Sequence, residues 1–598
     1  MEIVSGTTGR RGTPRILRIL SHAAFDVCLL LALAATGLRL LMSLTLHMWY
    51  APEQRADDAL LMSYSTSWYS ESTDPYRLAK NQSYGGFLRL VAWSGIPVDI
   101  MYFLLWLAAA VLAGIAVHAF FRNHWLSLFA YAYVLWNPAA FEDWTGTRLY
   151  RNSMTAPSLF ILLSLFMLLL AVPPFPCVRR IDPTTNDDPD IRRPAFPAAV
   201  SCALRLGGVA VLGMTTGLWF AFIYDLKEDS IWLVPMLAFV VLAGMVKALA
   251  TPHRWSLKIL AAAMCLLPIL TAYAGVQSVK GNNERDFGVA VLNTRTQGEM
   301  ATFVSYLYMV GNSDQTPDIW APAGSIEQVF AASPTLSKHP EMLDYLEHRD
   351  FAAPDIHEHP IHGDLISWQL LNAVAADIGM DDQQAVQRLF SQANQEIHTA
   401  FADGRLHATD KIMPLGSMVP RTPAQIKRIV RPSLRMYANA FLLKRYYRPS
   451  LHTNSPSREK GNAFGLRQLN IDLHNPNPTP LQWFTFADAQ RVATTMATTY
   501  RIINIMLLVM CAGAAVTAMT AAVWRRRWLP MGFVGLAACL GVYGFAYMFF
   551  VYWFTEYVKD DYVTFFYAYG SLAALLGMGL LVGAGALISA VRTRSGRA

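Results

Sequence analysis

The chain has 598 residues, of which 54% are hydrophobic and only 15% are charged. A soluble globular protein has about a quarter of its residues charged, so this composition excludes that class. The formal net charge is +7, and basic connections between apolar runs account for most of it, so no nucleic-acid partner is expected.

Long uncharged runs predict an all-α polytopic membrane protein. A helix needs about 20 apolar residues to cross the hydrocarbon core of a bilayer. Unpaired backbone groups cannot face lipid, which excludes an open sheet. We expect about ten transmembrane helices. They cover roughly residues 24–46, 98–120, 124–141, 154–174, 206–224, 231–249, 258–277, 502–523, 530–554 and 563–590.

The positions of lysine and arginine predict the orientation, because cytoplasmic connections carry the excess of both. With the two ends of the chain inside, every inner segment is basic. These segments carry Arg10, Arg11, Arg15, Arg18, Arg122, Arg179, Arg180, Arg192, Arg193, Arg254, Lys258, Arg525, Arg526, Arg527, Arg592, Arg594 and Arg597. We therefore expect a multi-pass protein of the cell (plasma) membrane with both termini in the cytoplasm.

This topology divides the chain into three parts. Residues 1–277 form an N-terminal membrane domain with spans one to seven, residues 278–500 an extracytoplasmic domain, and residues 501–598 the last three spans. The extracytoplasmic domain is expected to be mainly helical, since apolar residues repeat at helical spacing over 386–401, with Asp381 or Asp382 as the start signal.

The first outer segment, residues 47–97, contains two adjacent acids, Asp57 and Asp58. A carboxylate here can deprotonate an acceptor hydroxyl, or bind a divalent cation such as Mg, Mn or Ca that does so. Lys80 follows on the same side of the membrane and can neutralise a lipid phosphate or pyrophosphate. The alternative is an ordinary solvated acidic pair beside a span.

A short outer turn, residues 142–153, carries Arg148 and Arg151. At a spacing of three residues they share one face of a helix. Both lie outside, against the positive-inside trend, which favours binding of an anionic ligand. The alternative is that they pair with Glu142 and Asp143 of the same turn.

A second short outer turn contains Lys227, Glu228 and Asp229. The turn is only a few residues long, so its charges are held at the bilayer surface. This second acidic pair can bind a metal ion together with Asp57 and Asp58, or position an acceptor. The alternative is a polar turn without a role in chemistry.

Two further groups of residues have weaker support. Arg39 lies near the outer end of the first span, where it can bind phosphate or extend to the membrane interface. His357, His359, His362 and Asp364 are clustered, but their spacing fits no recognised zinc motif and favours a polar loop.

Four segments in this order resemble the GT-C superfamily of integral-membrane glycosyltransferases. They are ADDALLMSY after the first span, LAKNQSYGGFLRLVAWSGIP before the second, NPAAFEDWTGTRLYRNS after the third and LKEDSIWLVP after the fifth. The resemblance covers roughly residues 24–250.

The resemblance implies transfer of a sugar from a polyprenyl-phosphate-linked donor to an envelope glycan, lipid or protein on the outer face. It also implies that Asp57 or Asp58 is the base or metal ligand. This interpretation requires one of these acids to lie beside the turns that carry Arg148, Arg151, Glu228 and Asp229. The alternatives are a transporter or flippase of lipid-linked glycans, and a non-catalytic envelope assembly protein.

Overall fold

The computed structural model describes residues 15–49, 51, 55–65, 74, 76–171, 198–250, 255–452, 483–526 and 528–594. Within these ranges it contains helices and isolated bridges but no strands. Nine of the described helical segments are long and apolar enough to cross a membrane, which indicates a multi-pass membrane protein. They are Phe25–Leu46, Val98–Phe121, Arg151–Ala171, Leu206–Tyr224, Ser230–Ala250, Lys258–Phe287, Phe486–Trp524, Leu529–Val558 and Asp561–Val591.

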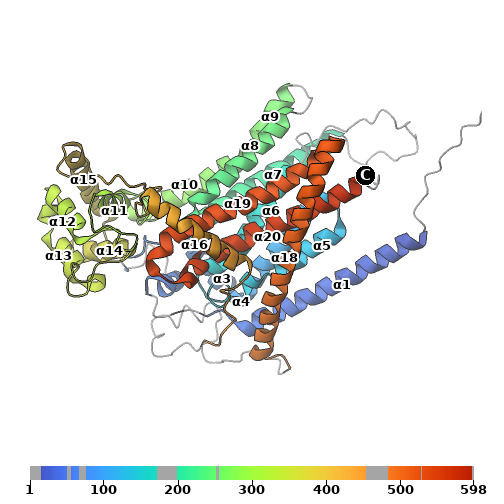
Figure 1. Cartoon of the computed structure of the whole chain (residues 1–598), viewed down its shortest axis with the longest axis horizontal. Coiled ribbons are helices and arrows are strands. Elements are labelled where there is room, and N and C mark those ends of the chain that lie inside the picture. Colours follow the sequence, from blue (N-terminus) through green and yellow to red (C-terminus); the bar gives the residue numbers. More distant parts are fainter. Residues whose placement is uncertain are drawn as a thin grey trace, which may run out of the picture.

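The long helices pack into one bundle, and a group of short helices projects from one of its ends (Figure 1). The bundle contains α1 (Arg15–Leu46), α4 (Val98–Phe121), α5 (His124–Leu135), α6 (Arg151–Ala171), α7 (Ala198–Tyr224), α8 (Val234–Ala250), α9 (Trp255–Cys265), α10 (Leu267–Phe287), α18 (Phe486–Arg525), α19 (Leu529–Thr555) and α20 (Asp561–Arg594). α6 and α20 are mostly buried within it, whereas α1 exposes most of its apolar face.

The expected third span, residues 124–141, is wrong in its length. α5 ends at Leu135, and its 12 residues cover about 18 Å, less than the roughly 30 Å of a hydrocarbon core. The segment nevertheless runs the length of α1. His124 contacts Phe25 near the beginning of the apolar part of α1, and the Asp143 carbonyl accepts from the Trp49 indole just beyond its end. The last part of this crossing is a turn containing Pro138.

The short helices form a unit that we call the helical domain, residues 288–443. It contains α11 (Glu299–Met309), α12 (Ala323–Ala332), α13 (Pro340–His348), α14 (Leu365–Asp377), α15 (Gln383–Ala402) and α16 (Pro423–Phe441). Its core is a separate apolar cluster that includes Phe303, Trp320 and Phe390. The mainly helical character is therefore confirmed, and Asp382 caps α15 as expected.

The boundaries of the membrane helices extend beyond the predicted spans on both sides of this domain. α10 continues to Phe287 and α18 begins at Phe486, so the expected boundaries at 277/278 and 500/501 fall inside helices. Pro52, which precedes the two acids of the first outer segment, lies outside the described residues. The inner connection 175–205 is described only from residue 198.

The helical domain docks on the connection between α19 and α20. Arg421 is fully buried and pairs with Glu556, and Lys559 pairs with Asp318 at 2.5 Å. Between these ion pairs, the Trp320 ring packs edge-on against the ring of Tyr557 at 5.5 Å. Burial of an arginine and of aromatic rings at one contact indicates a fixed rather than a tethered domain.

Gly363 sits at the closest approach in this contact. Its φ is +59°, and a Cβ at this position would lie 2.4 Å from ring carbons of Tyr557. We expect Gly363→Ala to lower the apparent melting temperature, because the side chain would force Tyr557 away in addition to straining the backbone. Gly379 is the matched control, since its φ is +78° but no atom lies within 4 Å. Equal losses in Gly363→Ala and Gly379→Ala would show that only backbone strain matters.

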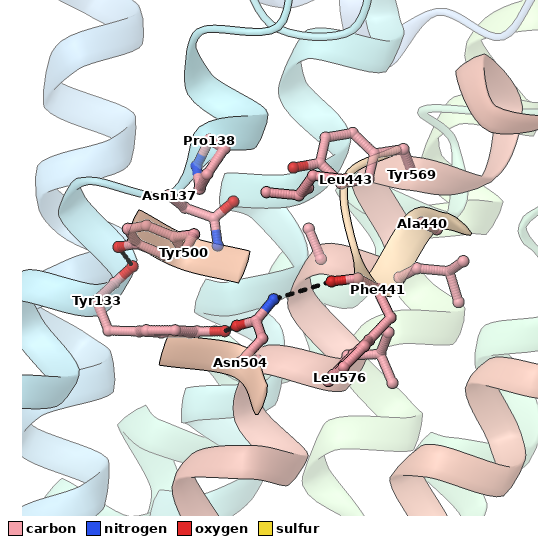
Figure 2. A pocket seen from close by; sticks show the side chains of 13 residues that line it. Tyr133, Asn137, Pro138, Ala440, Phe441, Leu443, Tyr500, Asn504, Tyr569 and Leu576 are labelled. Carbon is pink, nitrogen blue, oxygen red and sulfur yellow. Dashed lines mark hydrogen bonds between the residues drawn. The ribbon is translucent and has the colours of Figure 1, made fainter. Parts of the chain in front are cut away.

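A small cavity lies where α16 meets α5, α18 and α20 (Figure 2). The Tyr133 hydroxyl donates to the side-chain oxygen of Asn504 at 2.9 Å. The side-chain NH2 group of Asn504 donates to the backbone carbonyl of Phe441 at 3.2 Å. The cavity holds about 20 Å³, which is space for roughly one water molecule. It is far too small for a sugar, and the candidate site lies instead among the charged groups at the domain end of the bundle.

Candidate functional site

Asp58 is enclosed in the protein, contrary to the alternative of a solvated acidic pair. It lies in a π-helical turn, Arg55–Ala59, that continues into α2 (Leu60–Ser63). Both of its oxygens accept from the Arg148 guanidinium, with Nε at 2.9 Å from Oδ2 and Nη2 at 2.5 Å from Oδ1. The backbone N–H of Ala51 also donates to Oδ2. Asp58 is therefore fully engaged in a buried bidentate ion pair.

The backbone explains why Arg148 reaches the first outer segment. The Trp49 N–H donates to the Thr147 carbonyl at 3.0 Å, and the Leu149 N–H donates to the Trp49 carbonyl at 2.6 Å. These bonds fix residues 147–149 beside the end of α1. The guanidinium of Arg148 then lies near the rings of Trp144 and Tyr150, at 5.1 and 5.0 Å from their centroids.

Asp57 faces a different set of groups. Its Oδ1 accepts from the Lys80 ammonium and from the Tyr150 hydroxyl, the latter at 3.1 Å. The side chain of Asp57 is 33% exposed, whereas that of Lys80 is 2% exposed. Of the two adjacent acids, Asp57 is thus the one that is partly exposed to solvent.

Arg151 connects this pair to the second outer turn. Its guanidinium pairs with Glu228 and also donates to the Tyr150 hydroxyl at 3.2 Å. The Tyr150 hydroxyl in turn contacts Asp57. Asp57, Lys80, Tyr150, Arg151 and Glu228 therefore form one connected cluster from three segments, which we call the charged cluster.

Arg148 and Arg151 do not pair with the acids of their own turn. Glu142 accepts instead from the N–H groups of Trp144 and Thr145. Asp143 is bonded to the ring of His452 at 3.0 Å. The alternative of local pairing is therefore wrong, because the turn folds its own acids inward and presents its arginines to the two other segments.

The environment shifts the pKa values of the two adjacent acids in opposite directions. Burial alone would raise the pKa of Asp57, but the charges of Lys80, Arg151 and Arg148 hold it well below its usual range. Burial raises the pKa of Asp58 against the opposing effect of Arg148. For Glu228, burial is outweighed by Arg151 and Lys80, which lower the pKa to about 2. Separation of the pKa values of neighbouring acids is common at functional sites.

The remaining predicted residues lie outside the charged cluster. Arg39 is buried between helices, where it donates to Ser43 and to the Leu135 carbonyl. Its guanidinium also lies over the Phe141 ring at 4.4 Å. Lys227 approaches Asp229 at 3.7 Å. The Asp229 side chain is half exposed, whereas Glu228 is paired with Arg151 in the charged cluster. The two acids of this second pair therefore have different environments, as the two acids of the first pair do.

The sequence did not single out Asp225, which begins the second outer turn. One oxygen accepts from the N–H and the hydroxyl of Ser83, at 3.0 and 2.9 Å. The other oxygen is buried without a hydrogen-bond partner in the described structure. Burial raises the pKa of Asp225 to about 7, although the bonds from Ser83 lower it.

We expect Asp225→Asn to change the pH dependence of stability. Between the ordinary pKa of 3.8 and about 7, the folded state holds a proton that the unfolded state has lost. The free energy of unfolding therefore falls as the pH rises through this window. Asparagine resembles the protonated acid, so it should gain on the order of 2–4 kcal/mol relative to wild type between pH 4 and 8. Melting curves over this range measure the difference, and a constant offset would contradict the shift.

The carboxylates do not form a metal cluster. Within the described residues, no group of three or more His, Cys, Asp or Glu side chains is placed to bind one ion. Asp58 and Glu228 are each neutralised by an arginine. Among the described residues, the four predicted ligands Asp57, Asp58, Glu228 and Asp229 are not gathered into such a group.

Comparison with known proteins gives no family assignment: no protein-family model, curated protein or solved structure matches this chain. The site's function must therefore be argued from its geometry.

Proposed function

We propose that the protein is a membrane glycosyltransferase that moves a sugar from a polyprenyl-phosphate-type donor to an envelope glycan, lipid or protein. The observation that carries the proposal is the charged cluster. Three segments separated by up to about 170 residues bring one reachable carboxylate, Asp57, beside two buried cations, Lys80 and Arg151. A carboxylate beside cations suits a displacement in which a hydroxyl loses a proton and a phosphate leaves.

In this proposal an acceptor hydroxyl attacks the anomeric carbon, and the bond from that carbon to the phosphate oxygen breaks. The hydroxyl proton passes to Asp57, and the electron pair of the broken bond stays on the polyprenyl phosphate. Lys80 and Arg151 neutralise this leaving group. Direct displacement inverts the configuration at the anomeric carbon.

The pairing of Asp57 with Lys80 gives the proposal a specific requirement. A carboxylate whose pKa is held low is a weak base. When the donor phosphate attracts Lys80, the lowering effect of its charge on Asp57 weakens, and the basicity of the carboxylate increases. Donor binding therefore prepares the base.

The positions of the basic connections support a reaction on the outer face, and we propose the plasma membrane as its place. Asp58 and Arg148 support the arrangement without touching substrate. Asp229 and Lys227 lie at its edge, where they are proposed to meet the acceptor.

The test is transfer by the full chain in lipid nanodiscs, with polyprenyl-phosphate sugars as donors and envelope extract as acceptor. The expected result is release of polyprenyl phosphate that depends on the acceptor. Movement of intact lipid-linked glycan across vesicles without its cleavage would support a transporter instead. The alternative chemistry, a divalent cation at Asp57, predicts loss of transfer in EDTA and recovery with Mg, Mn or Ca.

A further inference from the structure

The helical domain encloses the segment that carries Lys80. The Thr294 N–H donates to the Leu78 carbonyl at 2.9 Å. On the other side of Lys80, the Asn293 amide donates to the Asn81 side chain at 2.7 Å. The domain thus forms hydrogen bonds with the chain on both sides of Lys80, and the bonding groups are uncharged.

The next residue of the domain, Arg295, adds a charge at this contact. It pairs with Asp364 at 2.6 Å, and its guanidinium lies 4.2 Å from the centroid of the Trp368 ring. The Lys80 ammonium lies 4.9 Å from the same centroid. Trp368 therefore holds two cations beside each other through cation–π contacts.

The charge of Arg295 also acts on the charged cluster. Burial raises the pKa of Glu228, and the charge of Arg295 adds to those of Arg151 and Lys80 in lowering it. The charge of Arg295 also helps to lower the pKa of Lys80, whose main cause is burial. The charge of Arg295 therefore acts on both Glu228 and Lys80. Three cations lie close to one another here: Lys80, Arg151 and Arg295.

Each of the three cations has a carboxylate partner, Asp57, Glu228 and Asp364 in turn, but the cations still repel one another, and an anion placed between them reduces this repulsion. Arg295 is not the only link between the domain and the first outer segment, because its neighbours Asn293 and Thr294 also bond there. An arginine offers a planar fork of donors that matches a phosphate group. These points favour a role in binding an anion.

We propose that Arg295 is a further binding residue for the phosphate of the lipid-linked donor, and that Trp368 is the positioning residue that holds Arg295 against Lys80. This inference rests on the proposed function. It makes the helical domain one wall of the site, so that the membrane half of the chain alone has an incomplete site.

The experiment measures binding of farnesyl phosphate and of farnesol to the full chain in nanodiscs. Wild type is expected to bind the phosphate more tightly than the alcohol. Arg295→Ala and Arg295→Gln should weaken binding of farnesyl phosphate by about tenfold or more, since a hydrogen bond to a charged group is worth about that factor. Binding of farnesol should not change. Arg295→Lys should lose less, because it keeps the charge.

The matched control is Arg405→Ala, which removes a half-exposed arginine of the same domain that pairs with Asp403. It should bind both ligands as wild type does. Trp368→Leu should weaken binding of the phosphate, and Trp368→Phe should restore it by returning an aromatic face. Melting curves establish that each variant is folded, and Arg295→Gln serves if Arg295→Ala is not.

Two results would overturn the inference alone. One is wild-type binding of farnesyl phosphate in both neutral Arg295 variants. The other is an equal loss of phosphate and alcohol, which would show that Arg295 only holds the domain in place. If wild type itself does not prefer the phosphate, the proposed function fails as well.

Discussion

Asp57→Asn is expected to reduce transfer by about 100- to 10,000-fold, the usual contribution of a positioned general base. The amide cannot accept the proton of the acceptor hydroxyl. Asparagine keeps the shape of the side chain but leaves the buried Lys80 ammonium without its carboxylate partner, so the melting temperature should also fall, and rates are compared for folded protein. Initial rates of polyprenyl-phosphate release at saturating donor measure the effect on the chemical step.

Two comparisons test whether the loss of transfer is specific to Asp57. Asp410→Asn, on an exposed part of the helical domain, should transfer as wild type does. Farnesyl phosphate should bind to Asp57→Asn at least as tightly as to wild type, because Lys80 loses its carboxylate partner and is free to pair with the phosphate. Transfer at the wild-type rate in Asp57→Asn would remove Asp57 as the base.

The main effect of changing Asp58 should be on the stability of the protein and not on the chemical step. Removing one partner of a buried ion pair typically costs about 3–5 kcal/mol, because the other charge is left without compensation. We expect Arg148→Met to lower the free energy of unfolding by that amount, and Asp58→Asn by less, because burial raises the pKa of the Asp58 carboxyl. Chemical unfolding of the full chain in mixed micelles measures the change.

A double-mutant cycle separates the ion pair from other contacts of these residues. Asp58→Asn combined with Arg148→Met should cost clearly less than the sum of the single changes, since no unpaired charge remains. Additive losses would contradict a direct interaction. The exposed pair Arg405–Asp403 provides a surface reference, where the same cycle should give about 1 kcal/mol or less.

The helical class could be predicted from the sequence because apolar length is a local property. Nine of the ten expected runs contain helices of membrane-spanning length. The exception, 124–141, failed because a run of apolar residues does not specify where its helix ends. Here α5 ends at Leu135 and Asn137 caps a short 3-10 turn that begins at Pro138.

The charged residues of the site could be found from their positions, but their partners could not. Lys80, Arg148 and Glu228 stood out because charges are rare next to apolar runs. Nothing local in the sequence indicates that Arg148 bonds to Asp58 and Arg151 to Glu228. Tyr150 was within a segment of interest, yet only the fold shows that its hydroxyl joins Asp57 to Arg151. Arg295 and Trp368 gave no signal, because their environment is made by residues far away in the chain.

The segments that enclose Lys80 are synthesised long after Lys80 itself. This lysine is synthesised more than 200 residues before Arg295 and almost 300 before Trp368. During that interval the nascent chain has the first acids and both outer turns, but the lysine has no cover. Its final environment also needs the contact of Tyr557 with Asp364, which comes close to the end of the chain. Assembly of this site is therefore a late event, completed only when α19 has been made.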